Sequence, residues 1–155
     1  MKRKYFEPRN PGFVCLHCQK QVPAKRTMGT MHRNHCPFCL WSRHVDWKVA
    51  GDRSAACGEP MEPLGLTLKH EGVDKYGKKR VGELMLVHRC HGCGDYSINR
   101  LAADDKAEDV IKIFENSLKL SNEDKKIILE QRFILLEEKD RQEIMIQLYG
   151  LVPIV

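Results

Sequence analysis

The hydrophobic pattern divides the chain into a strand-rich part and a helical tail. Residues 64–69 alternate apolar and other side chains, residues 82–89 form a second strand-like run, and a polar stretch joins them, which predicts an antiparallel hairpin. Residues 96–101 follow a glycine and predict a third strand. Between residues 13 and 39 the apolar pieces are short and lack a 3.6-residue period, so we expect loops and short strands there.

After residue 103 the period changes to that of helices. Apolar residues spaced by three and four predict a helix that starts at a cap, Asp104, and ends near residue 120. Ser121 predicts the N-cap of a second helix that ends at residue 137 or 138, and Asp140 opens a third that stops at Gly150.

These elements predict a small α+β protein of two parts. A β-rich domain is expected over residues 1–103, and a helical C-terminal extension over residues 104–155. The extension would either pack on the first domain or grip a protein partner.

The cysteines point to metal binding. All seven cysteines and all seven histidines lie between residues 15 and 93, and an odd number of cysteines without an export signal argues against a disulfide framework. Two Cys-x-x-Cys pairs are separated by 17 residues. Zinc takes four ligands tetrahedrally, and each such turn presents two thiolates. We therefore expect one structural zinc site made by Cys15, Cys18, Cys36 and Cys39.

A second site is incomplete in the sequence. Cys90 and Cys93 form a third pair, whereas Cys57 has Ser54 three residues before it in place of a cysteine. We favour His44 as the fourth ligand, with Asp46 as the acceptor that orients its imidazole. The remaining candidates are His88, as the runner-up, then His70, His91, Asp52 and water.

Charge also differs between the two parts. Residues 1–103 hold 18 Lys and Arg against 9 Asp and Glu, whereas residues 104–155 hold 8 against 12. A basic domain attracts polyanions, of which nucleic acid is the commonest. Phosphate contacts are expected from two loops, one with Lys20, Lys25, Arg26 and Arg33, the other with Lys75, Lys78, Lys79 and Arg80. Tyr76, Trp41 and Trp47 could stack on unpaired bases; ordinary solvated loops and packed rings are the alternatives.

Several short strings together resemble a known family. Arg33-Asn34-His35-Cys36-Pro37 occurs with His44-Val45-Asp46, Cys57-Gly58, His88-Arg89-Cys90, Cys93-Gly94 and Asn99-Arg100. This resembles the RNHCP-domain family of small prokaryotic zinc-ribbon-like proteins over roughly residues 10–105. The resemblance implies a cysteine-rich, zinc-binding fold and no established reaction. We therefore expect residues 1–103 to form a zinc-ribbon-like, β-rich domain with two metal sites. Gln19 stands where a knuckle glycine is usual, and Glu59 where a second glycine is common.

The sequence favours a non-enzymatic protein that binds structured RNA on the ribosome or another translation complex. A chain of 155 residues excludes large multidomain enzymes, and no apolar run approaches the ~20 residues of a membrane span, so we expect a cytoplasmic protein without a membrane partner. P-loop, dinucleotide, Gly-x-Ser-x-Gly and zinc-deaminase motifs are absent from the sequence.

Two alternatives remain open. The extension is similar, over residues 120–133 and 140–151, to the opening helices of the DNA-binding region of bacterial sigma factors without their recognition helix, which suggests a protein-interaction module of the transcription machinery. A zinc hydrolase would need an open position for zinc-bound water and Asp46, Asp52 or Glu59 as general base.

Overall fold

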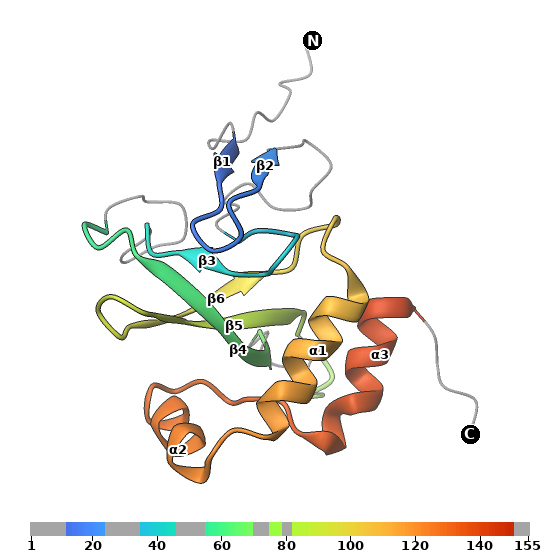
Figure 1. The fold of residues 1–155 in the computed structure, drawn as a ribbon. Coiled ribbons are helices and arrows are strands. Elements are labelled where there is room, and N and C mark those ends of the chain that lie inside the picture. The colour runs from blue at the N-terminus through green and yellow to red at the C-terminus, as the bar shows by residue number, and fades with distance from the viewer. Residues whose placement is uncertain (1–11, 24–34, 46–54, 70–74, 79–81, 151–155) are drawn as a thin grey trace.

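A computed structural model describes residues 12–23, 35–45, 55–69, 75–78 and 82–150. These residues form two antiparallel sheets and three α-helices (Figure 1), which confirms the predicted small α+β fold. In this part of the chain no helix is long and apolar enough to cross a membrane.

The strands form a small ribbon and a larger sheet. The ribbon pairs β1 (Gly12–Val14) with β2 (Gln21–Pro23). The larger sheet has the order β3-β4-β5-β6. Its strands are β3 (Ser42–Arg43), β4 (Pro60–Leu68), β5 (Leu84–Cys90) and β6 (Tyr96–Arg100). The predicted hairpin and third strand are confirmed, with Leu66 opposite Leu86 in the β4–β5 register.

The helices are α1 (Ala107–Leu118), α2 (Asn122–Glu130) and α3 (Arg141–Tyr149), the last preceded by a 3-10 turn at Glu138–Asp140. The N-cap of α1 is Lys106, so the prediction of Asp104 as the cap is wrong. The Ser121 cap is confirmed, because its hydroxyl accepts from the Asp124 N–H at 3.1 Å. Gly150, in the left-handed region at φ 65°, ends α3 as predicted.

The second helix ends at Glu130, earlier than its apolar pattern predicts. Arg132 has φ 67° and turns the chain out of the helix. The Leu136 N–H then donates to the Leu66 carbonyl at 2.8 Å, and the Thr67 hydroxyl donates to the Ile134 carbonyl at 2.7 Å. The short strand β3 pairs with Pro60 and Met61, at the start of β4. Residues 134–136 lie along the same edge of β4 at Leu66 and Thr67. They therefore cover backbone groups of β4 that β3 does not reach.

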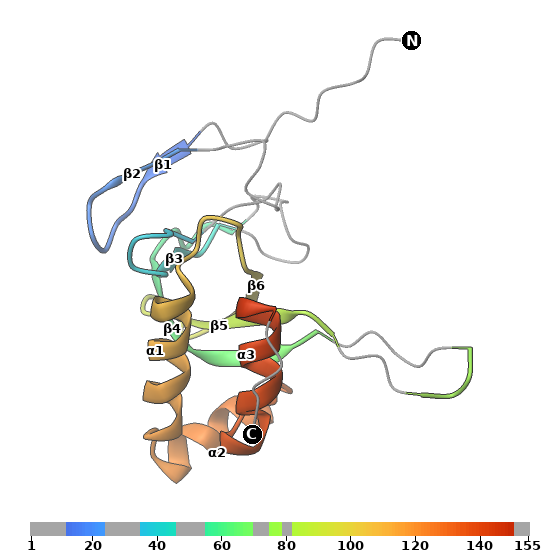
Figure 2. The ribbon, with the colours of Figure 1, turned by 90° about the vertical axis from the view of Figure 1, so that its right-hand side faces the viewer.

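The extension packs on the larger sheet. Figures 1 and 2 show α1 and α3 side by side against that sheet. One buried cluster joins sheet and helices: Leu40, Leu66, Leu84, Leu86, Val110, Phe114, Leu136 and Ile144. Gln147 adds a polar tie, because its side chain accepts from the Leu84 N–H and donates to the Gly82 carbonyl, both at 2.9 Å. The domain boundary at residue 103 stays a prediction, but the hydrophobic core extends across it.

Candidate metal centres

The first cluster lies where the ribbon meets a second turn of the chain. Cys15 and Cys18 occupy the turn between β1 and β2, and Cys36 and Cys39 a turn before β3. The Sγ atoms of Cys15 and Cys39 are 3.5 Å apart and those of Cys18 and Cys36 are 3.6 Å apart. All four sulfurs lie within 4.8 Å of one another. Tetrahedral Zn–S bonds of about 2.3 Å would separate the sulfurs by roughly 3.8 Å, so this enclosure fits one ion.

The local backbone of each Cys-x-x-Cys turn explains how the thiols converge. The first sulfur of each turn accepts from backbone: Cys15 from the Cys18 N–H at 3.5 Å, Cys36 from the Phe38 N–H at 3.4 Å and Cys90 from the Gly92 N–H at 3.4 Å. These bonds hold each sulfur toward the inside of its turn.

The residue after the second cysteine is left-handed in each turn. Its φ is 61° at Gln19, 65° at Leu40 and 81° at Gly94, and Gly58 after Cys57 has 64°. This conformation suits glycine and costs other residues about 1–2 kcal/mol. Gln19 therefore takes the conformation expected of the usual knuckle glycine, and the turn geometry survives that departure.

The second cluster forms where strands of the larger sheet end. His44 follows β3, Cys90 is the last residue of β5, and Cys93 lies in the turn beyond it. The Cys93 Sγ is 3.3 Å from His44 Nδ1, the Sγ atoms of Cys57 and Cys90 are 3.6 Å apart, and all four ligand atoms lie within 4.8 Å of one another. The backbone of His44 is fixed on both sides, since its N–H donates to Glu59 and its carbonyl accepts from Gly58.

The second candidate for the fourth ligand, His88, uses both ring nitrogens in hydrogen bonds outside the cluster. It is fully buried, donates from Nε2 to the Leu40 carbonyl at 2.7 Å and accepts at Nδ1 from Asn99 Nδ2 at 2.8 Å. Burial lowers the pKa of His88 to about 3, so the ring is neutral and structural. His91 points its Nε2 at Glu62, 3.0 Å away. Asp46, Asp52 and His70 lie outside the described residues.

The thiols of each cluster resist joint ionisation. Burial raises the pKa of Cys36 to about 11 and moves that of Cys39 further above its usual range. At Cys90 burial opposes ionisation, but backbone N–H groups of Cys93 and Gly92 outweigh it and lower the pKa to about 7. Desolvation and the neighbouring Cys90 raise the pKa of Cys93 to about 11. A divalent cation would supply the charge that lets all the thiols deprotonate.

A buried His–Asp pair anchors the first cluster to the helices. His35 Nε2 donates to Asp105 Oδ2 at 2.6 Å, with side chains 1% and 2% exposed. The same carboxylate oxygen accepts from the Ala102 N–H at 2.7 Å. Because His35 directly precedes Cys36, the pair holds the second cysteine turn against the start of α1. The sequence reasoning missed this role, although His35 belongs to the family-like string.

Few of the predicted nucleic-acid contacts can be located. Lys20, Lys75 and Lys78 are exposed, whereas Lys25, Arg26, Arg33, Lys79 and Arg80, like Trp47, lie outside the described residues. Tyr76 is 77% exposed with the Lys75 ammonium 5.0 Å from its ring centre. Phe38 is 46% exposed with the Lys20 ammonium at 4.9 Å. Phe38 was not among the predicted contacts, although its position inside a Cys-x-x-Cys turn could have indicated an exposed ring.

Trp41, also predicted as a base-stacking ring, packs against two histidines. Its ring lies parallel to that of His17, with centroids 4.0 Å apart and planes at 3°, and the His91 ring meets it edge-on at 5.0 Å. One aromatic face is thus already covered by a histidine.

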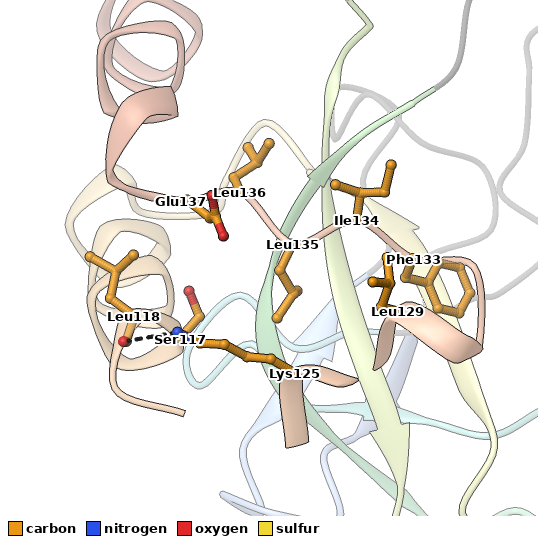
Figure 3. A pocket seen from close by; sticks show the side chains of 9 residues that line it. All are labelled: Ser117, Leu118, Lys125, Leu129, Phe133, Ile134, Leu135, Leu136 and Glu137. Atoms are coloured by element: carbon orange, nitrogen blue, oxygen red, sulfur yellow. Dashed lines mark hydrogen bonds between the residues drawn. The ribbon is translucent and has the colours of Figure 1, made fainter. Parts of the chain in front are cut away.

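An apolar groove lies on the helical extension, away from the cysteine clusters. Figure 3 shows it between the end of α1, helix α2 and the segment that follows α2. Its volume is about 160 Å³, and Lys125 reaches across one rim to donate to the Leu118 carbonyl at 3.4 Å. Two of its apolar side chains, Leu129 and Ile134, are 60% and 61% exposed.

Comparison with known proteins agrees with the cluster geometry. No curated protein and no solved structure matches the chain. A family model described as the RNHCP domain matches residues 10–111, a span that runs from the ribbon into α1 and includes all eight cluster residues. The chain therefore belongs to the RNHCP-domain family.

Proposed function

We propose that this chain is a non-enzymatic module that holds two zinc ions and uses the resulting rigid framework to bind structured RNA on the ribosome or another translation complex. The observation that carries the metal assignment is the convergence of four ligand atoms within 4.8 Å in each of two clusters. Sulfur and imidazole donors in tetrahedral sets are those that zinc prefers.

Full ligand sets favour a structural role over hydrolysis. A catalytic zinc keeps one position for water, whereas three thiols and an imidazole in the second cluster fill four. Of the candidate bases, Asp46 and Asp52 lie outside the described residues. Glu59 is exposed and its stem lies beside Gly92 of the third cysteine turn, but a filled ligand set leaves no zinc-bound water for it to activate.

Exposed aromatic–lysine pairs support RNA as the partner. Phe38 with Lys20 and Tyr76 with Lys75 each offer a ring for an unpaired base and an ammonium for the adjacent phosphate. Figure 2 shows the turn at residues 75–78, which contains Tyr76, well away from the helices. This exposed turn offers its ring and its ammonium groups to folded RNA.

Elemental analysis and ribosome binding test this proposal in turn. Protein purified under reducing conditions should contain two zinc ions per chain, and a metal-free but folded protein would overturn the metal assignment. Co-sedimentation with ribosomes should be strong at low salt and fall as salt rises. Lys75→Glu with Lys78→Glu should weaken this binding, while Lys112→Glu with Lys126→Glu, at exposed positions of α1 and α2, is the control with the same change of charge. Failure to sediment even at the lowest salt would overturn RNA binding.

A protein-interaction module is the second candidate, favoured by the apolar groove (Figure 3). Its occupant would be an apolar segment of a partner protein. Binding would then survive nuclease treatment and be lost in Leu129→Asp, because Leu129 is 60% exposed and lines the groove. Leu136 also lines the groove, but it is 6% exposed and belongs to the core, so its substitution would not separate binding from stability.

A further inference from the structure

The two metal clusters are joined by an aromatic bridge. His17 lies inside the Cys15–Cys18 turn of the first cluster, and His91 inside the Cys90–Cys93 turn of the second. Trp41 lies between them, stacked on His17 with centroids 4.0 Å apart and met by the edge of His91 at 5.0 Å. Each histidine is directly bonded along the chain to a cluster cysteine, so the three rings form a continuous contact from one cluster to the other.

The backbone of Trp41 belongs to the same connection. Its carbonyl accepts from the Cys36 N–H at 2.8 Å and so closes the second cysteine turn of the first cluster. Three residues later His44 enters the second cluster. Ser42 and Arg43, which lie between Trp41 and His44, are fixed by pairing with Met61 and Pro60. Leu40, which precedes Trp41, is buried in the core at 1% exposure. A displacement of Trp41 would therefore shift ligand residues in both clusters.

We infer that Trp41 is a positioning residue that couples the two metal centres, so that metal bound at one cluster raises the affinity of the other. The inference rests on the proposed metal function. Metal at the first cluster fixes the Cys15–Cys18 turn and holds His17 on the indole. The indole then restricts His91, and with it the turn that carries Cys90 and Cys93. Because linkage is reciprocal, metal at the second cluster strengthens the first by the same factor.

The expected size follows from the contacts. An aromatic pair contributes enough to shift an equilibrium constant by about 2- to 10-fold, and the wild-type coupling should fall in this range. The coupling should be lost without the indole and largely retained by a phenyl ring, which preserves stacking on His17.

The experiment is a double-mutant cycle on the full chain with Co²⁺ as the probe. The second cluster's Co²⁺ affinity is measured from its thiolate absorption, with the first cluster intact and disabled by Cys15→Ser with Cys18→Ser, in wild type, Trp41→Ala and Trp41→Phe. Disabling the first cluster should weaken the second by about 2- to 10-fold in wild type and in Trp41→Phe. In Trp41→Ala it should have no effect. Leu16→Ala, which removes a side chain 48% exposed from the Cys15–Cys18 turn and leaves the three rings in place, should behave as wild type.

Outcomes separate this inference from the proposed function. If the wild-type chain binds no Co²⁺ or Zn²⁺, the metal function itself fails. If both clusters bind but the effect of disabling the first is the same in wild type and Trp41→Ala, only the coupling is overturned. Should the disabled variant not fold, Co²⁺ titration of the intact chain replaces it: the affinity of the second binding step relative to the first should be about 2- to 10-fold higher in wild type than in Trp41→Ala. Identical filling curves would again overturn the coupling.

Discussion

The two cysteine clusters differ in how much hydrophobic core supports them. In the described part of the chain, the small hydrophobic cluster at the first metal site consists of its own Cys15 and Cys36 together with Val22, and the main core reaches this site through Leu40, next to Cys39. The second cluster lies at the ends of strands whose sheet shares a core of eight buried residues with the helices. Hydrophobic burial can therefore maintain the frame of the second cluster, whereas the ribbon of the first has little besides metal to order it.

Metal removal should produce the largest effect and the sharpest contrast. Chelation under reducing conditions should abolish hydrogen-exchange protection in the ribbon, residues 12–23, because a structural zinc contributes about 10–16 kcal/mol in small zinc domains. Residues 35–39 should lose less protection, since the buried His35–Asp105 pair also holds that turn. The amides of β4 and β5 should keep most of their protection, since the core beneath them does not involve the ions. Uniform loss of protection across ribbon and sheet would show that the two regions do not differ as argued.

A core substitution should destabilise the larger sheet and leave metal binding at the first cluster intact. Phe114 is 1% exposed at the centre of the shared core, so Phe114→Ala should lower the free energy of unfolding by about 3–5 kcal/mol. Urea unfolding measures this, and the folded protein should still bind metal at the first cluster. Ile134→Ala, at a side chain 61% exposed, is the control and should stay within about 0.5 kcal/mol. Metal loss from the first cluster in folded Phe114→Ala would contradict the comparison.

A single methyl group should weaken the second cluster alone. A Cβ on Gly92 would lie 2.5 Å from the Glu59 Cγ and 3.0 Å from the Cys57 Sγ. The Glu59 side chain can move away from the added methyl group, but Cys57 must stay in place to bind the metal. Gly92→Ala should therefore weaken metal binding at the second cluster by about 1–3 kcal/mol. The metal content of each cluster, read from Co²⁺ spectra, checks this. Gly77→Ala, where nothing lies within 4 Å, should leave both clusters loaded.

Relief of backbone strain should give the smallest effect and the opposite sign. Gln19 is exposed and left-handed at φ 61°, so Gln19→Gly should stabilise the ribbon by up to about 1 kcal/mol. The melting temperature of the zinc-loaded protein measures it. Leu40→Gly is the matched comparison: its φ of 65° is similar, but its side chain is buried in the core, and its loss should cost about 2–5 kcal/mol. A destabilised Gln19→Gly would show that the side chain contributes more than the strain.

Some elements were predictable because their signals are local. The β4–β5 hairpin follows from alternation within each strand, and the Ser121 cap and the Gly150 stop follow from side chains that bond their own backbone or tolerate its handedness. Helix α2 was predicted too long for the same reason. Its apolar spacing continues past Glu130, but Leu135 lies against Gly65 of β4 and Leu136 enters the core, and a periodicity cannot distinguish these uses from a longer helix.

The sequence by itself determined which side chains could bind metal, because a Cys-x-x-Cys turn brings its two thiols together whatever surrounds it. Tertiary structure alone decided the rest: that His44 joins Cys57, Cys90 and Cys93, that His88 is buried against Leu40 and Asn99, and that Trp41 lies between two cysteine turns. The reason is physical. These contacts join residues far apart along the chain, and the sheet register and the shared core fix their distances, which no local pattern encodes.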